Sequence, residues 1–235
     1  FCYDWANGNP RFNTVGSYTY NTGAHLEMVQ DISGEGFDAY YVKIKQQALS
    51  YLDKVTVKFS DGQQMVIDGN FPTVISPNPE NPEGFYLAIQ LADKVGADFI
   101  LGTDPDSDRV GIAVNQGGEF KLMTGNEVGI LLLNFIAKVK QEQGKLPAHP
   151  VAVTTIVSTD MVDPIAQHYG IEMRRCLTGF KYIGDIIADV EQKEGSYESF
   201  LLGFEESYGY LSGGYVRDKD AVDGSMLIRE MASYY

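Results

Sequence analysis

Apolar and polar residues alternate in regular blocks along the C-terminal half of the chain. Short apolar runs predict buried strands, and apolar residues repeated every three or four positions predict helices. Strands and helices are expected in alternation over residues 151–157, 160–169, 171–176, 182–194, 200–204 and from 222 onward. Alternation at these lengths is typical of βαβ units around a mostly parallel sheet.

The pattern is weaker near the N-terminus. Residues 1–36 show no periodicity and are dominated by Asn, Gly, Thr and Tyr, so we expect an irregular lead-in. Apolar residues at helical spacing predict an amphipathic helix from Phe37 to Leu52. Two apolar runs, at 55–59 and 64–67, flank Asp61-Gly62 and predict strands joined by a turn.

The middle of the chain is more regular. Four prolines between Phe71 and Glu83 exclude regular structure and predict a stiff, extended loop. Thr124 or Asn126 is placed to cap a following helix. The expected elements are a helix, two strands and this second helix, over residues 85–95, 97–101, 110–114 and 128–139. The polar stretch 138–150 that follows is the expected linker.

These elements predict an α/β protein of two consecutive α/β/α domains with mixed, mostly parallel sheets. The length suits one or two domains. We place an irregular lead-in at 1–36, the first domain at 37–147 and the second at 148–235. Because the chain lacks an initiator Met and ends abruptly, we expect a piece of a longer protein.

Charge narrows the possible partners. A formal net charge of -14 argues against binding to a nucleic-acid backbone or to an anionic membrane surface. No apolar run approaches the roughly 20 residues of a membrane span. Cys2 and Cys176 are far apart and match no metal or redox spacing. We therefore expect a cytoplasmic protein without disulfides.

The clearest candidate chemistry lies between the strands predicted at 97–101 and 110–114. Asp104, Asp106 and Asp108 stand at alternate positions, and Arg109 follows directly. Oxygen-only ligands on a loop suit a hard cation such as Mg²⁺, which takes few carboxylates together with a substrate phosphate. Neighbouring carboxylates also repel one another unless a cation or an arginine neutralises them. The pattern therefore predicts a magnesium site.

Two other interpretations of this loop compete. A solvated acidic turn would carry the same residues without a ligand. An EF-hand fits poorly, because it would need Gly at Arg109 and Glu at Asn115. A helix should also follow an EF-hand loop, whereas a strand is predicted here.

Two further loops follow predicted strands, at the sheet edge where ligands gather. Thr178-Gly179-Phe180-Lys181 offers a glycine for close backbone approach and a lysine suited to phosphate. Gly203-Phe204-Glu205-Glu206-Ser207 offers the carboxylate and hydroxyl groups that a sugar requires. Each of these signals has a simpler interpretation when it is taken alone. Lys181 would be a solvated lysine, and Glu205 and Glu206 would lie at the start of a helix, where they complement its dipole. Arg217–Asp220 would form a solvated turn.

Together these segments resemble the α-D-phosphohexomutase family, the phosphoglucomutases and phosphomannomutases. Residues 104–109 resemble its metal-binding loop, 178–181 the loop whose lysine approaches the reacting groups, and 203–207 its sugar-specificity loop. Further matching segments are Pro77–Glu80, Thr124–Glu127, and residues 203–209 and 217–224, the last two most like the phosphoglucomutase and phosphopentomutase branch.

The resemblance implies a mutase that interconverts sugar 1-phosphate and 6-phosphate through a phosphoserine and a bisphosphate intermediate. It implies Mg²⁺ as the cofactor and a sugar phosphate as the ligand. The implied residues are Asp104, Asp106 and Asp108 as metal ligands, Arg109 and Lys181 in catalysis, and Thr178, Gly179, Glu205 and Ser207 in substrate binding.

Other elements of the family pattern are not recognisable in this sequence. These are the Ser-His-Asn-Pro segment that carries the phosphoserine, the Arg-x-Ser-Gly-Thr-type phosphate loop, and a Tyr-Thr-Pro-Leu-His-Gly-type segment expected near residues 50–70. The chain thus resembles the family's second and third domains. We expect it to be inactive alone, with the missing domains as its partners.

Two other functions stay open at this point. One is a non-catalytic module that binds a metal or a sugar phosphate. The other is a different Mg²⁺-dependent α/β phosphotransferase with Asp104 as an aspartyl nucleophile, although such an enzyme would not need Glu205 and Ser207.

Overall fold

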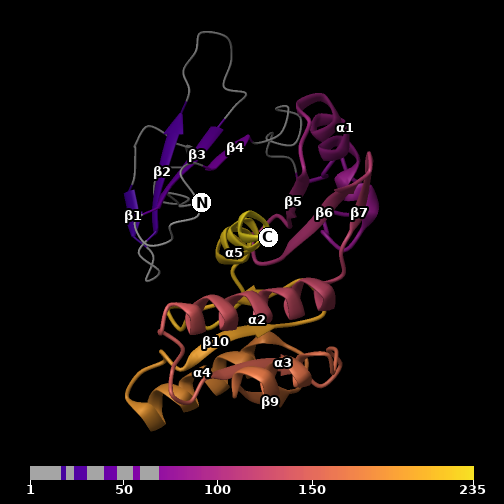
Figure 1. Ribbon diagram of the computed structural model, residues 1–235. Helices are drawn as coiled ribbons and strands as arrows, with labels where there is room; N and C mark the ends of the chain where they lie inside the picture. The colour runs from indigo at the N-terminus through magenta and orange to yellow at the C-terminus, as the bar shows by residue number, and fades with distance from the viewer. Residues whose placement is uncertain (1–16, 20–23, 31–39, 47–54, 59–68) are drawn as a thin grey trace, which may run out of the picture. The chain divides into compact units, whose positions relative to one another are not determined.

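The computed structural model describes residues 17–19, 24–30, 40–46, 55–58 and 69–235 (Figure 1). The chain forms two compact units that divide between Ile75 and Ser76. Among the helices in these ranges, none is both long and apolar enough to cross a membrane.

The first unit contains an antiparallel sheet. Its strands follow one another in sequence order: β1 (Ser17–Thr19), β2 (Ala24–Gln30), β3 (Tyr40–Gln46) and β4 (Val55–Lys58). β2 and β3 pair along their whole length, from Ala24 opposite Gln46 to Gln30 opposite Tyr40. The strand predicted at 55–59 is confirmed as β4, and the one predicted at 64–67 lies outside the described residues.

This sheet corrects two predictions. β1 and β2 occupy part of the expected irregular lead-in, and β3 stands where a helix was predicted over Phe37–Leu52. The helix prediction was wrong because Val42 and Ile44 alternate with Lys43 and Lys45, a period of two residues that is typical of a strand. Counting apolar residues at helical spacing over the longer range Phe37–Leu52 hid this alternation. β-branched residues at alternate positions favour the strand.

The second unit contains a small antiparallel sheet of β5 (Phe99–Thr103), β6 (Val110–Gln116) and β7 (Glu119–Leu122). The short helix η2 (Pro82–Phe85) and α1 (Tyr86–Val95) precede it, and no helix or strand interrupts the proline-rich residues 71–81. Phe85, Ala92, Ile100 and Ala113 form the core between helix and sheet.

The expectation of mostly parallel strands does not hold for this sheet. Parallel neighbours need a crossover of about a dozen residues, whereas the loop after β5 is short and returns directly to β6, with Thr103 opposite Val110. Gly117 and Gly118, both at positive φ, then turn the chain tightly into β7.

The remaining sheet is mixed and mostly parallel, as predicted. Its order is β11-β10-β8-β9, with β8 parallel to both neighbours and β11 antiparallel to β10. The strands are β8 (Val151–Thr155), β9 (Glu172–Cys176), β10 (Phe200–Phe204) and β11 (Tyr210–Leu211), and the helices between them are α3 (Val162–Tyr169) and α4 (Phe180–Glu194).

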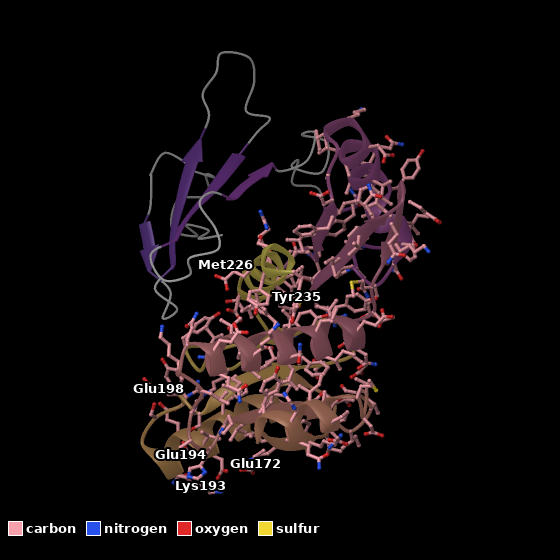
Figure 2. All side chains as sticks on the ribbon, viewed as in Figure 1. Glu172, Lys193, Glu194, Glu198, Met226 and Tyr235 are labelled. Carbon is pink, nitrogen blue, oxygen red and sulfur yellow. The ribbon has the colours of Figure 1, made fainter. Side chains whose placement is uncertain are left out.

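This sheet is covered on both faces. α2 (Gly125–Glu142) covers one face, where it contacts α3 and β10, and α4 packs against β8 and β10 on the other (Figure 1). Side chains fill the space between the layers (Figure 2). On the α4 face the core consists of Val151, Val153, Phe180, Ile183, Ile187, Val190, Phe200 and Leu211. The predicted α/β fold with α/β/α layering is confirmed.

α2 begins with the predicted cap and runs further than predicted. The Thr124 hydroxyl accepts from the Glu127 backbone N–H at 3.2 Å, and Glu127 accepts from the Thr124 backbone N–H at 2.7 Å. This reciprocal capping fixes the helix start. The helix continues to Glu142, into the expected linker, and the chain turns at Gly144, which has a positive φ.

The last helix, α5 (Ala221–Tyr234), is anchored by two aspartates. Asp220 caps it by accepting from the backbone N–H groups of Val222 and Asp223. The buried Asp223 carboxylate accepts from the Ser212 backbone N–H at 2.7 Å and from the Ser212 hydroxyl at 2.8 Å. These bonds tie the helix start to the segment after β11.

We predict that stability without divalent cations falls as the pH rises from about 5.5 to 8. Burial raises the pKa of Asp223 to about 6 and that of Glu230 to about 7. The folded chain therefore binds these protons more tightly than the unfolded chain, so this contribution is complete below about pH 4 and is lost as the pH rises through the folded pKa values. Thermal unfolding should show a Tm decrease of about 5 °C.

Asp223→Asn is the matched variant for this pH dependence. Asparagine does not titrate, and it can still bond twice to Ser212, with its oxygen accepting from the backbone N–H and its NH₂ group donating to the hydroxyl. Its Tm should therefore fall less over the same pH range. An equal decrease in the variant would show that Asp223 does not contribute.

Candidate metal and sugar-phosphate site

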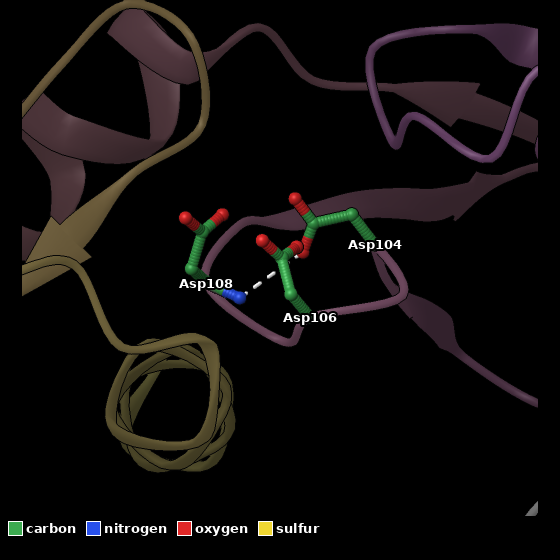
Figure 3. A group of neighbouring side chains, drawn as sticks. All are labelled: Asp104, Asp106 and Asp108. Carbon is green, nitrogen blue, oxygen red and sulfur yellow. Dashed lines mark hydrogen bonds between the residues drawn. The ribbon is translucent and has the colours of Figure 1, made fainter.

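The loop at residues 104–109 brings the three predicted aspartates together. One carboxylate oxygen each from Asp104, Asp106 and Asp108 lies within 4.8 Å of the others, and all three side chains rise from this single loop (Figure 3). The chain turns at Ser107, which has φ 58°. The three carboxylates thus form a group that could hold a metal ion, and a set of hard carboxylate oxygens fits Mg²⁺.

Backbone hydrogen bonds hold this loop in shape. Asp104 Oδ1 accepts from the backbone N–H groups of Asp108 at 3.1 Å and Arg109 at 3.0 Å, the former drawn in Figure 3. The Ser107 N–H donates to the Asp104 carbonyl at 3.1 Å. The loop geometry is therefore set by the chain itself.

The loop is crowded with charge. Burial raises the pKa of Asp104 to about 6, with a further rise caused by Asp108 and Asp106, although the N–H of Arg109 opposes it. The Arg109 guanidinium lies 3.3 Å from Glu80, 3.8 Å from Asp104 and 3.9 Å from Asp108, measured between nitrogen and oxygen. Glu80 belongs to the proline-rich loop, so that loop helps to orient the arginine.

The two loops predicted to bind phosphate and sugar lie next to each other, after β9 and β10. Glu205 is buried, and its Oε1 accepts from the Gly179 backbone N–H at 2.7 Å. Burial raises the pKa of Glu205, while the Gly179 bond and the charges of Lys219 and Arg109 lower it in part. Ser207 is half-buried on the same loop as Glu205, and Thr178 is exposed beside Gly179.

A polar network holds the loop of residues 203–207, called the sugar loop from here on, against the end of β8. Glu206 Oε2 accepts from the hydroxyls of Thr155 at 2.9 Å and Ser158 at 3.2 Å. Both hydroxyl-bearing residues are buried at the carboxyl end of β8. Glu206 thus anchors the loop to the sheet, which the sequence interpretation of a helix-start pair did not foresee.

The loop of residues 104–109, called the aspartate loop from here on, is connected to the sugar loop by backbone hydrogen bonds. The Val110 N–H donates to the Tyr208 carbonyl at 3.1 Å, and Arg109 pairs with Gly209 in an isolated β-bridge. The Ala221 N–H donates to the Ser107 carbonyl at 3.0 Å. Residues from distant parts of the sequence therefore lie side by side.

Two lysines, one predicted to belong to the site and one not, differ in their surroundings. Lys181 is exposed at the start of α4, with its Nζ 4.8 Å from the ring centroid of Tyr182. Lys219 was assigned to a solvated turn, but its side chain is only 15% exposed and its Nζ lies 2.6 Å from Asp108 Oδ2. The signal that could have found it is a lysine among aspartates shortly after the sugar loop.

Comparisons with known proteins identify the domains. Two family models match the chain, described as phosphoglucomutase/phosphomannomutase alpha/beta/alpha domain II over residues 15–118 and domain III over residues 124–235. The first match ends at residue 118 and the second begins at residue 124, just before α2, whereas the predicted linker was 138–150. The first match also begins within the segment predicted to be an irregular lead-in.

Curated relatives match about seven tenths of the chain. A phosphoglucomutase of Staphylococcus aureus (strain USA300) is 39% identical over 167 residues, which cover 71% of this chain and 29% of that protein. A phosphomannomutase of Mycoplasmoides pirum is 37% identical over 169 residues, 72% of this chain and 30% of that protein. The chain thus spans about three tenths of the length of these relatives.

The fold comparison agrees with the family models. The crystal structure of a phosphoglucomutase/phosphomannomutase family protein from Burkholderia thailandensis matches with a TM-score of 0.55 and 19% identity, covering 72% of this chain and 33% of that one. The chain therefore belongs to the phosphoglucomutase/phosphomannomutase family, the α-D-phosphohexomutases, and carries that family's domains II and III.

Proposed function

We propose that this chain is the metal-binding and sugar-binding part of a Mg²⁺-dependent mutase of the phosphoglucomutase type. The complete enzyme would interconvert sugar 1-phosphate and 6-phosphate through a phosphoserine and a bisphosphate intermediate. The phosphoserine would come from a domain outside residues 1–235, and the chain alone would bind without turnover.

One observation carries this proposal. Three carboxylates converge on a loop whose shape is set by its own backbone bonds, and that loop is hydrogen-bonded to the loop that carries Glu205. Bound Mg²⁺ would supply positive charge to a transferring phosphoryl group, and such reactions depend mainly on positioning and charge neutralisation. Asp104, Asp106 and Asp108 would hold it.

Arg109 is suited to a second charge-stabilising role. Its planar guanidinium can present two parallel N–H donors to phosphate oxygens. The ion pairs with Glu80, Asp104 and Asp108 orient the group, while a third of the side chain stays exposed to a ligand. Lys181, also exposed, would supply a point charge to the same phosphate.

The sugar would lie against the adjacent loops. Glu205, held by the Gly179 N–H, can accept from a sugar hydroxyl, and the Ser207 hydroxyl can donate or accept. Thr178 adds a hydroxyl at the exposed edge. Gly179, at φ 116°, lets the backbone approach the ligand without a side chain.

The geometry favours a ligand role for Asp104 over the aspartyl-nucleophile alternative. Two backbone N–H groups already donate to its Oδ1, which lowers the nucleophilicity of that oxygen. Its other oxygen lies 3.8 Å from Arg109 Nε. A carboxylate held in this way is better placed to bind a cation than to attack phosphorus.

The test is isothermal titration of the chain with MgCl₂ at pH 7.5, beside Asp106→Asn and Asp93→Asn. Asp106 is the most exposed of the three aspartates, so its amide variant should fold normally while weakening Mg²⁺ binding at least about tenfold. Asp93, exposed on α1, controls for the loss of one negative charge. Equal binding by all three proteins, or no binding by any, would contradict the proposal.

A further inference from the structure

We propose that Lys219 is the internal counter-ion of the aspartate loop and that a divalent cation must displace it from Asp108. This inference rests on the proposed function, because it takes Asp108 to be a metal ligand. It adds to that function a residue that competes with the metal and that comes from domain III, whereas the aspartates belong to domain II.

The ion pair is close and shielded from solvent. Lys219 Nζ lies 2.6 Å from Asp108 Oδ2, with the lysine side chain 15% exposed and the aspartate side chain 26% exposed. By comparison, Arg109 Nε approaches Asp108 only to 3.9 Å, and the shortest ion pair of Arg109 is with Glu80. Lys219 is thus the nearest cation to this carboxylate among the described residues.

The lysine stem is guided to this position by Gly209. A Cβ added to Gly209 would lie 2.6 Å from Lys219 Cδ and 3.3 Å from its Cβ, so the stem crosses the glycine backbone directly. Gly209 is also the residue that pairs with Arg109 in the β-bridge. Gly209 therefore has two roles. Its backbone joins the two loops, and the lysine side chain that crosses it reaches the aspartates.

A metal ion and the ammonium group cannot share this position. Like charges a few ångströms apart repel strongly when they are partly shielded from water. A cation bound to Asp108 would therefore force Nζ to move. A second partner is within reach, because Asp218 Oδ1 lies 3.4 Å from the same Nζ and its side chain is 71% exposed.

Displacement has a consequence for ligand binding. In the metal-free chain the Lys219 ammonium group forms an ion pair with Asp108. Once the cation binds the Asp108 carboxylate, the Lys219 ammonium group can pair with another anion. It would then lie at the edge of the loop that carries Glu205, where an anionic sugar phosphate would bind. Metal binding and anion binding would then favour each other through this one side chain.

The test measures Mg²⁺ affinity by calorimetry at constant ionic strength in four proteins: the unchanged chain, Lys219→Met, Lys219→Arg and Lys193→Met. Lys193, labelled in Figure 2, lies in the last turn of α4 and pairs with Asp189, so its variant controls for the loss of one positive charge elsewhere. Lys219→Met should bind Mg²⁺ about threefold to tenfold more tightly, because the competing charge is gone. Lys219→Arg, which keeps the charge, and Lys193→Met should stay within about twofold of the unchanged chain.

A gain in affinity separates this inference from simple damage to the site, which would weaken binding. Unchanged or weaker binding by Lys219→Met would overturn it, while loss of binding in Asp106→Asn would leave the proposed function intact. If neither the unchanged chain nor Lys219→Met bound Mg²⁺, both this inference and the proposed function would be overturned.

Discussion

Gly125→Ala is expected to lower the free energy of unfolding by about 3 kcal/mol. Alanine is normally the better helix residue by about 1 kcal/mol, so the expected sign is opposite to the intrinsic preference. The reason is contact with the sugar loop. A Cβ at Gly125 would lie 2.1 Å from the Glu206 carbonyl oxygen and 2.9 Å from the Tyr208 nitrogen, and both are backbone atoms that a rotamer change cannot move.

Gly84→Ala is the matched control for this change. A Cβ there would meet only the carbonyls of Asn78 at 3.7 Å and Ser76 at 3.9 Å, which are ordinary contacts. Urea unfolding followed by circular dichroism should show a large loss of stability for Gly125→Ala and little change for Gly84→Ala. Equal stability of the two variants would mean that α2 does not pack against the sugar loop as described.

Asp223→Ala is expected to cost about 2 to 3 kcal/mol. The carboxylate accepts from both the backbone N–H and the hydroxyl of Ser212, in a place where Asp223 is only 6% exposed. Truncation leaves those donors without their partner inside the protein, and an unsatisfied buried donor costs more than the bond itself contributed. The start of α5 should loosen as a result.

The amide variant separates hydrogen bonding from charge. Asp223→Asn can accept from the Ser212 N–H and donate to its hydroxyl, so at pH 7 it should retain most of the stability that Asp223→Ala loses. Thermal unfolding of the three proteins side by side measures the difference. If the alanine and asparagine variants were equally stable, the bonds to Ser212 would not be what holds α5.

The parts of the fold that the sequence predicted well are those with local causes. The Thr124 cap and the helix after it follow from hydrogen bonds within four residues. The alternation from β8 to β10 follows from strongly periodic apolar runs with turn residues between them. The aspartate loop was placed correctly between two strands because the apolar runs on either side are short and clear.

The parts that it missed depend on contacts between distant residues. Nothing near Lys219 in the sequence indicates that its side chain reaches Asp108, and nothing near Gly125 indicates that Glu206 packs against it. The direction of β5 to β7 depends on how the chain returns after each strand rather than on apolar content. β3 was mistaken for a helix because a short segment can satisfy both periods.

The central claim is that Asp104, Asp106 and Asp108 together hold one divalent cation, and the most direct test is a crystal structure of the chain with Mn²⁺. Manganese shares the preference of Mg²⁺ for oxygen ligands and gives an anomalous signal that identifies its position. We predict a single peak in contact with a carboxylate oxygen of each aspartate, with Lys219 Nζ withdrawn from Asp108. An ordered loop without a peak, or a peak bound by other residues, would contradict this account.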